Sequence, residues 1–100
     1  MPFHFDDRLA ASVEIVFGTD AFEAIEDIAK VRVEDVEVHG VFLLFGEVDA
    51  VAWISTPFKG TVAPTIRLAR WVNAVRALEH VKTTKTSVIV AERHPQQRAR

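Results

Sequence analysis

The 100-residue sequence contains no cysteine and no tyrosine, and it has only four glycines, four prolines and one methionine. Without cysteine there is no disulfide framework and no thiolate metal site. The scarcity of glycine and proline, with 49% hydrophobic and 26% charged residues, is typical of a globular chain rather than a disordered one. The length fits a single domain, and we find no internal repeat or low-complexity segment.

A surplus of basic residues is also missing, because 12 Lys and Arg face 14 Asp and Glu for a net charge of −2. Binding through phosphates needs such a surplus, so we expect no direct nucleic-acid binding. The unbroken apolar runs are far shorter than the roughly 20 residues that span a bilayer. The first ten residues, MPFHFDDRLA, lack the basic segment and apolar core of a secretory signal. We therefore expect a soluble cytoplasmic protein that binds no membrane.

The first half of the chain predicts a strand followed by a helix. Residues 12–17, SVEIVF, alternate between apolar and polar and predict a strand. Asp20 and Glu23 have the spacing of a capping box at a helix start. The helix that follows has an apolar face at helical spacing, and we expect that face to be buried. Its members are Phe22, Ile25, Ile28 and Ala29.

The second half predicts three more strands and one more helix. Residues 36–45 and 49–55 read as strands joined by a tight connection at 46–48, and residues 84–92 read as the last strand. Pro64 suits the first turn of a helix. From there an apolar stripe recurs at helical spacing, consisting of Leu68, Trp71, Val72, Val75 and Leu78. Three arginines lie off this stripe and are expected to be solvated or to meet acids of the first helix: Arg67, Arg70 and Arg76.

The element order is β-α-β-β-α-β, which predicts an α+β, ferredoxin-like domain. Right-handed crossovers place both helices on one face of a four-stranded antiparallel sheet. We assign this domain to residues 11–92, between an N-terminal tail at 1–10 and a C-terminal tail at 93–100.

The stretch VFLLFGEVDAVAWIS, residues 41–55, carries apolar side chains on both faces of its two strands. The helices cover one face, and the other has no further element to cover it. Leaving four large side chains exposed would forfeit roughly 6–12 kcal/mol, comparable to the stability of a small domain. We therefore expect a homodimer in which two sheets pack face to face. The predicted interface residues are Phe42, Leu44, Val51, Trp53 and Ile89.

Several segments together resemble the effector domain of Lrp/AsnC transcription regulators, also called the RAM domain. They are GEVDAVAWI, RLARWVNAVRALEHV and VKTTKTSVIV. In the family, a Gly-x-aromatic-Asp turn follows the second strand, and Val with two threonines leads the last strand. Gly46 and Asp49 match the turn, and Val81, Thr84 and Thr86 match the last segment. The resemblance covers about residues 10–92.

The resemblance implies a dimeric α/β barrel, often assembled further into octamers, that binds small effectors, usually amino acids, without a cofactor. The effector site would use the turn and the last strand: Gly46, Glu47, Val48, Asp49, Thr84 and Thr86. Full-length members carry an N-terminal helix-turn-helix for DNA. Because the first strand begins after about ten residues, we expect a stand-alone effector domain that can join full-length Lrp/AsnC regulators in mixed assemblies.

This chain departs from the family pattern at two places. Val48 replaces the usual aromatic residue before Asp49, and the 55–63 loop is longer than usual; both bear on which ligand is bound. The same residues also have structural readings. Gly46 supplies a backbone angle that the turn requires, and Asp49 either caps the turn or holds the ammonium of an amino acid. Thr84 and Thr86 also suit an edge strand.

Besides a purely structural assembly domain without a ligand, two further function classes stay open from the sequence. One is a small enzyme, such as a monooxygenase or isomerase, that uses the interior of the same dimeric barrel. The sequence lacks tyrosine and cysteine. Of its polar side chains, only His39 and Glu14 are placed where they could take part in catalysis inside the barrel, so we expect no catalysis. The other is an ACT-like amino-acid-binding regulatory domain with the same element order. The four histidines have no metal-binding spacing, so we expect no metal.

Overall fold

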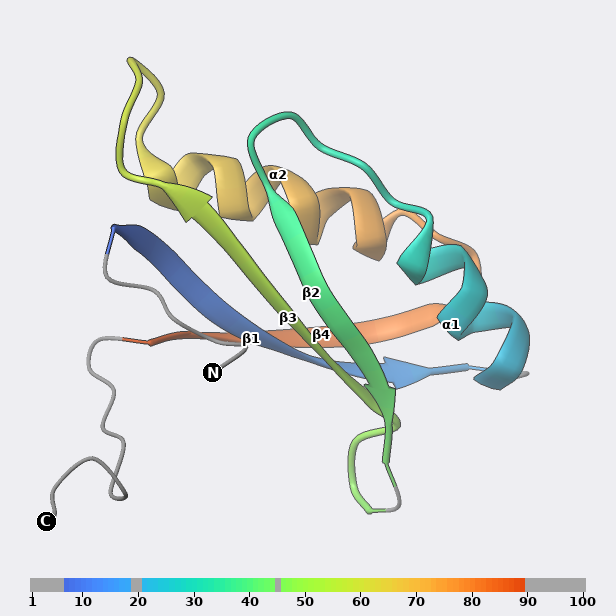
Figure 1. The fold of residues 1–100 in the computed structure, drawn as a ribbon. Coiled ribbons are helices and arrows are strands. Elements are labelled where there is room, and N and C mark those ends of the chain that lie inside the picture. Colours follow the sequence, from blue (N-terminus) through green and yellow to red (C-terminus); the bar gives the residue numbers. More distant parts are fainter. Residues whose placement is uncertain (1–6, 19–20, 45, 90–100) are drawn as a thin grey trace, which may run out of the picture.

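The computed structural model describes residues 7–18, 21–44 and 46–89. The elements are β1 (Arg8–Phe17), α1 (Ala21–Ala29), β2 (Glu37–Leu43), β3 (Ala50–Pro57), α2 (Pro64–Arg76) and β4 (Val81–Ile89). The strands form one antiparallel sheet in the order β2-β3-β1-β4. Both helices lie on the same side of this sheet (Figure 1). The predicted ferredoxin-like fold is confirmed.

The strands differ from the predicted ones mainly at their starts. β1 begins at Arg8, within the segment predicted as a tail, because Arg8 pairs with Pro57 at the end of β3. β4 begins at Val81, which pairs with Phe17 across an irregularity in β1. Asp20, the predicted helix cap, lies outside the described residues, as do residues 90–92 of the predicted domain and the tail at 93–100.

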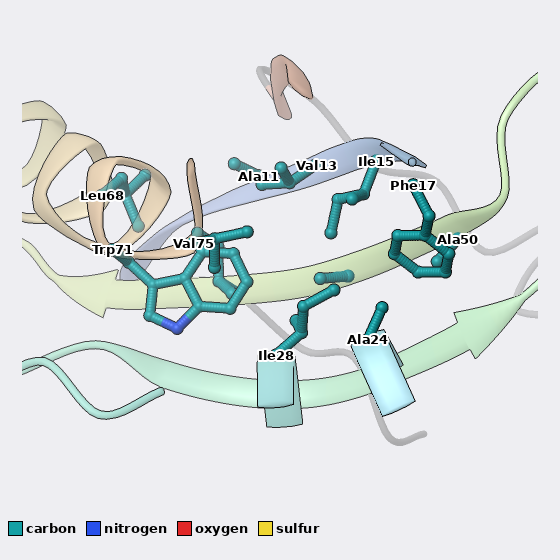
Figure 2. Packing of buried hydrophobic residues seen from close by; sticks show 12 residues of the cluster. Ala11, Val13, Ile15, Phe17, Ala24, Ile28, Ala50, Leu68, Trp71 and Val75 are labelled. Carbon is teal, nitrogen blue, oxygen red and sulfur yellow. The ribbon is translucent and has the colours of Figure 1, made fainter. Parts of the chain in front are cut away.

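The core lies between the sheet and the two helices (Figure 2). The alternation predicted for β1 is confirmed, because Val13 and Ile15 are fully buried and Phe17 is 8% exposed. On β3, Ala50 pairs with Ile15 and Ala52 with Val13, and both alanines are also fully buried, as is Ile54 opposite Ala11. From α2 the buried apolar side chains are Leu68, Trp71 and Val75. Pro64 occupies the first turn of α2, as predicted.

The buried face of α1 differs from the predicted one. Ala24 and Ile28, one helical turn apart, face the sheet, whereas Phe22 is 75% exposed and Ala29 is exposed. Phe22 precedes Ala24 by two positions, about 200° around the helix, so it points to the opposite side. The small Ala24 lets α1 lie close to the sheet, where the helix contacts β2, and leaves Phe22 on the outer side of the helix.

The sheet face turned away from the helices is partly apolar and partly polar. Phe42 pairs with Val51, and Trp53 pairs with Ser12 on the neighbouring β1. Along β1 and β4 the same face carries the pairs Glu14–Lys85 and Ser12–Ser87, with Ile89 beside Ala10 at the end. The apolar part of this face therefore lies mainly on β2 and β3. We call it the open face.

Candidate functional site

The turn between β2 and β3 has the geometry that its glycine and aspartate predict. Gly46 has a φ of +149°, a region that favours glycine. A Cβ added there would meet no atom within 4 Å, so backbone conformation rather than space requires the glycine. The backbone N–H of Leu44 donates to the carbonyl of Asp49 at 2.9 Å and closes the turn. Glu47 is exposed and Val48 is half-buried.

Asp49 ties this turn to the end of β1. Its Oδ2 accepts the backbone N–H of Phe17 at 2.7 Å, and its own N–H donates to the carbonyl of Ile15 at 3.0 Å. Phe17 lies beyond the last β1–β3 pair, Ile15 with Ala50, so the carboxylate takes the place of a β3 backbone acceptor there. The side chain thus has a defined structural role. A ligand ammonium at this position would share the carboxylate with Phe17.

Thr84 and Thr86, two of the three threonines of β4, lie on the helix side of the sheet. Thr84 pairs with Ile15 and Thr86 with Val13, both core residues. Since Ala50 also pairs with Ile15, Thr84 is two strand spacings from the end of the turn, roughly 10 Å. Thr86 lines a cavity of about 260 Å³ between α2 and β4, together with Leu68, Val72 and Arg76 among others. The structure therefore brings Thr84 and the turn to one end of the sheet, with Thr86 farther from it.

The predicted interface residues in β2–β4 share the open face. Phe42 is 45% exposed, and Val51, Trp53 and Ile89 are half-buried. Leu44 is 43% exposed and lies just past the end of β2. Val41 and Leu43, which alternate with Phe42, pair with Ala52 and Ala50 on the helix side. One apolar set faces the helices and the other faces away, as predicted.

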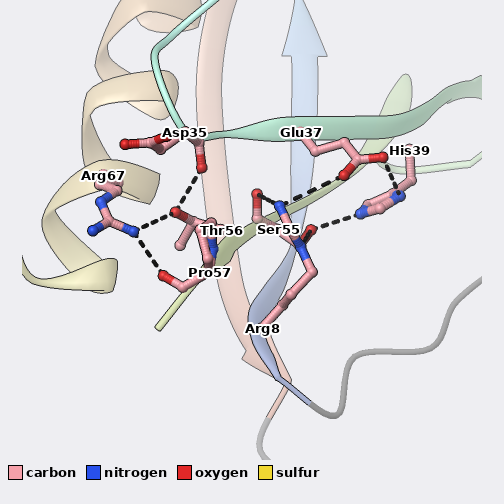
Figure 3. Close-up of polar contacts among 8 residues, drawn as sticks. All are labelled: Arg8, Asp35, Glu37, His39, Ser55, Thr56, Pro57 and Arg67. Carbon is pink, nitrogen blue, oxygen red and sulfur yellow. Dashed lines mark hydrogen bonds and ion pairs between the residues drawn. The ribbon is translucent and has the colours of Figure 1, made fainter. Parts of the chain in front are cut away.

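A polar cluster on the open face joins three strands (Figure 3). It consists of Arg8 from β1, Glu37 and His39 from β2, and Ser55 from β3. Arg8 Nε donates to Ser55 Oγ at 2.7 Å, and His39 Nε2 lies 2.7 Å from the same oxygen. Glu37 lies 3.6 Å from the Arg8 guanidinium and 3.8 Å from His39 Nδ1. His39 occupies the irregular step of β2 between Val38 and Gly40. A bulge there re-aims a side chain, which explains its reach toward Ser55.

Ser55, His39 and Glu37 have the order of a nucleophile, a base and an orienting acid. However, Ser55 has no exposed surface, and its hydroxyl already accepts a hydrogen bond from Arg8. A nucleophile must reach its substrate, so this cluster is built to hold three strands together. Glu14, the other polar group considered for catalysis, faces Lys85 and lies elsewhere on the open face.

The prediction that Arg67 lies on a solvated face is wrong, because the residue is only 4% exposed. Its Nη1 donates to Thr56 Oγ1 at 3.1 Å and to the Pro57 carbonyl at 2.6 Å (Figure 3). Its Nη2 donates to the Lys59 carbonyl. Thr56 in turn donates to the carbonyl of Asp35 at 2.7 Å. The backbone of Pro57 and Lys59 supplies two of these three acceptors, and no spacing within α2 could have indicated them.

The predicted pairing between the arginines of α2 and the acids of α1 is not observed. Within the described residues, Arg67, Arg70 and Arg76 form no ion pair, and Glu23 of α1 lies 3.3 Å from His80 instead. Across the same described ranges, no group of His, Asp and Glu side chains could hold a metal ion. No helix in the described part of the chain is long and apolar enough to cross a membrane.

No family model matches the sequence, and no curated protein matches it significantly. Solved structures do match. The crystal structure of PH0061 aligns with a TM-score of 0.65 and 17% identity over 88% of this chain and 55% of its own. The crystal structure of MtbAldR aligns with a TM-score of 0.62 and 18% identity, over 86% of this chain and 54% of its own. The crystal structure of the hypothetical protein PHS023 from Pyrococcus horikoshii aligns with a TM-score of 0.57 and 16% identity, over 90% of this chain and 99% of its own.

PH0061 and MtbAldR are Lrp/AsnC-family proteins. The chain has a RAM-like fold. At identities of 16 to 18% the likeness is one of fold. The chain spans about half the length of the first two proteins, and the RAM-like fold accounts for nearly the whole of PHS023.

Proposed function

We propose that this RAM-like domain is an oligomerising module of the Lrp/AsnC type that binds a small amino-acid effector. The observation that carries the proposal is the match of nearly the whole domain to PH0061 and MtbAldR, over 88% and 86% of the chain. The effector would bind at the Gly46–Asp49 turn and Thr84, with Thr86 at the edge of the site. The module would act in transcription regulation through full-length Lrp/AsnC regulators rather than by binding DNA itself.

The dimer in this proposal forms through the open face. Phe42 and Leu44 retain 45% and 43% of their surface exposed, beside half-buried Val51 and Trp53. Burying a large apolar side chain contributes about 1.5–3 kcal/mol, and contiguous patches of this kind mark interaction sites. A second copy carries the same patch, so a two-fold contact between sheets satisfies both copies. Octamers would need further contacts between such dimers.

The oligomeric state tests the first half of the proposal. Light scattering coupled to size exclusion should give a dimer or a multiple of it for the natural protein. Phe42→Asp should shift the mass toward the monomer, because it places a charge at the centre of the apolar patch. Phe58→Asp is the matched control, since Phe58 is 54% exposed in the loop after β3 and lies off the open face. A monomeric natural protein would refute this half.

A thermal-shift screen against the twenty amino acids and several 2-oxo acids tests the second half. A ligand at 100 times its Kd stabilises by about 2.7 kcal/mol per site. For a domain this size that raises Tm by roughly 10–20 °C. A selective hit that is lost in Asp49→Ala, with the assembly intact, supports binding at the turn. Because Asp49 also holds Phe17, the shift must be compared with the ligand-free Tm of the same variant.

A further inference from the structure

A hollow of about 270 Å³ lies at the end of the sheet opposite the Gly46–Asp49 turn, and we call it the loop hollow. It is bounded by the turn before β2, the loop after β3 and the first half of α2. Its lining residues are Glu34, Asp35, Gly60, Thr61, Val62, Arg67 and Arg70. β3 separates it from the Gly46–Asp49 turn by eight residues, roughly 25 Å.

The buried guanidinium of Arg67 is the unusual group in this wall. A buried charge is normally paired with an opposite charge, because desolvation without a partner costs several kcal/mol. Arg67 instead donates three hydrogen bonds to neutral oxygens, and no carboxylate within the described residues pairs with it. Since a guanidinium has five N–H donors, two remain without an acceptor in this part of the chain. The site thus holds a guanidinium that forms no ion pair within the described residues and keeps donors to spare.

The remaining charges of the loop hollow are arranged by sign. Arg70 lies on α2 three residues after Arg67, so the two guanidinium groups share one side of the helix. Glu34 and Asp35 come from the turn before β2. The lining therefore balances two positive against two negative side chains that belong to different elements. A ligand carrying one charge of each sign complements this arrangement better than a simple anion does.

The backbone around the loop hollow is held in unusual conformations. Asp35 has a φ of +66° and Gly60 a φ of +104°. A Cβ at Gly60 would clash with Nη2 of Arg67, so only glycine lets this loop lie against the guanidinium. The Thr56 hydroxyl links the Asp35 turn to Arg67. These contacts hold Arg67 and the backbone of Asp35 in place before any ligand arrives, which lowers the ordering cost of binding.

We propose that the loop hollow binds a small zwitterion, most simply an α-amino acid, with its carboxylate on Arg67 and Arg70 and its ammonium toward Glu34 and Asp35. Charge-assisted hydrogen bonds of this kind are the strong ones in proteins. At about 30 Å³ per water, the volume equals roughly nine waters, which suits a small amino acid. The proposal goes beyond the proposed function, because the site lies at the opposite end of β3 from the Gly46–Asp49 turn.

The test is titration of the natural protein with each of the twenty amino acids by calorimetry. The best hit is then compared with its analogues lacking the ammonium or the carboxylate, such as propionate and ethylamine for alanine. Arg70→Gln should raise the dissociation constants of the amino acid and of its carboxylate analogue about tenfold or more, the equivalent of one charged hydrogen bond. Glu34→Gln should raise the dissociation constant of the amino acid but not that of the carboxylate analogue. Both residues are exposed, so both variants should keep the Tm of the natural protein.

Arg76→Gln is the matched control, since Arg76 is an exposed arginine of the same helix outside the loop hollow. No binding of any amino acid, or equal loss in Arg70→Gln and Arg76→Gln, overturns the proposal. A hit that is lost in Asp49→Ala but unchanged in Arg70→Gln also overturns it while leaving the turn site supported. A hit that is lost in Arg70→Gln but unchanged in Asp49→Ala supports binding in the loop hollow and removes the turn from the proposed function.

Discussion

Replacing Gly60 by alanine should destabilise the domain more than replacing Gly46 by alanine. Both glycines have a positive φ, +104° and +149°, so each alanine incurs a backbone cost of about 1–3 kcal/mol. The Cβ at Gly46 meets nothing within 4 Å, whereas the Cβ at Gly60 displaces the Arg67 guanidinium. Losing one hydrogen bond of that charged group adds about 1.5–3 kcal/mol. The extra loss corresponds to a Tm lower by roughly 6–24 °C.

Urea denaturation of the two variants measures this difference directly. A double-mutant cycle then assigns its cause: in an Arg67→Met background, Gly60→Ala should cost no more than Gly46→Ala, because the clashing group is gone. The Gly46→Ala cost should be the same in both backgrounds, since the turn lies at the other end of β3. Equal costs for the two glycines in the natural background would refute the account of Arg67 as a buried group held by the 57–59 loop.

Three further outcomes follow from single side chains. Asp49→Ala should lower the free energy of unfolding by about 1.5–3 kcal/mol through loss of the Phe17 hydrogen bond, whereas Asp49→Asn should lose less; urea titration compares the two. Trp71→Ala should cost about 3–5 kcal/mol, and Trp71→Phe much less, since it also removes an indole N–H that has no acceptor in the described residues. A Trp71→Phe cost as large as that of Trp71→Ala would contradict this. Phe42→Asp should raise the dissociation constant of the dimer at least tenfold in sedimentation equilibrium, with Phe58→Asp unchanged.

β1 was predictable because its apolar and polar residues alternate in a way that only one register satisfies. Val13, Ile15 and Phe17 on β1 meet Ala50 and Ala52 on β3, and shifting either strand by one residue would expose the whole set. The assignment of β2 and β3 to two apolar faces followed from the same rule. The positive φ of Gly46 was also accessible, since a tight connection between two strands commonly requires it.

The buried Arg67 and the exposed Phe22 were not accessible from the sequence. Side-chain chemistry predicts that arginine is solvated and phenylalanine buried, and both expectations fail when backbone from a distant segment intervenes. The carbonyls that accept from Arg67 belong to residues ten and eight positions before it, at the end of β3 and in the loop that follows, where the sequence has no periodic pattern. The candidate site at the loop hollow therefore needed three-dimensional information, whereas the turn site came from a motif.

Ser55 and Thr56 are neighbours in β3 that point to opposite faces of the sheet. Ser55 belongs to the polar cluster on the open face, and Thr56 contacts Arg67 beside the loop hollow. One peptide unit thus connects the surface where a second copy would dock to the place where a ligand would bind. Thermodynamic linkage is reciprocal: if a ligand at Arg67 tightens the dimer by some factor, dimerisation tightens that ligand by the same factor. A ligand affinity that rises with protein concentration would be the signature of this connection.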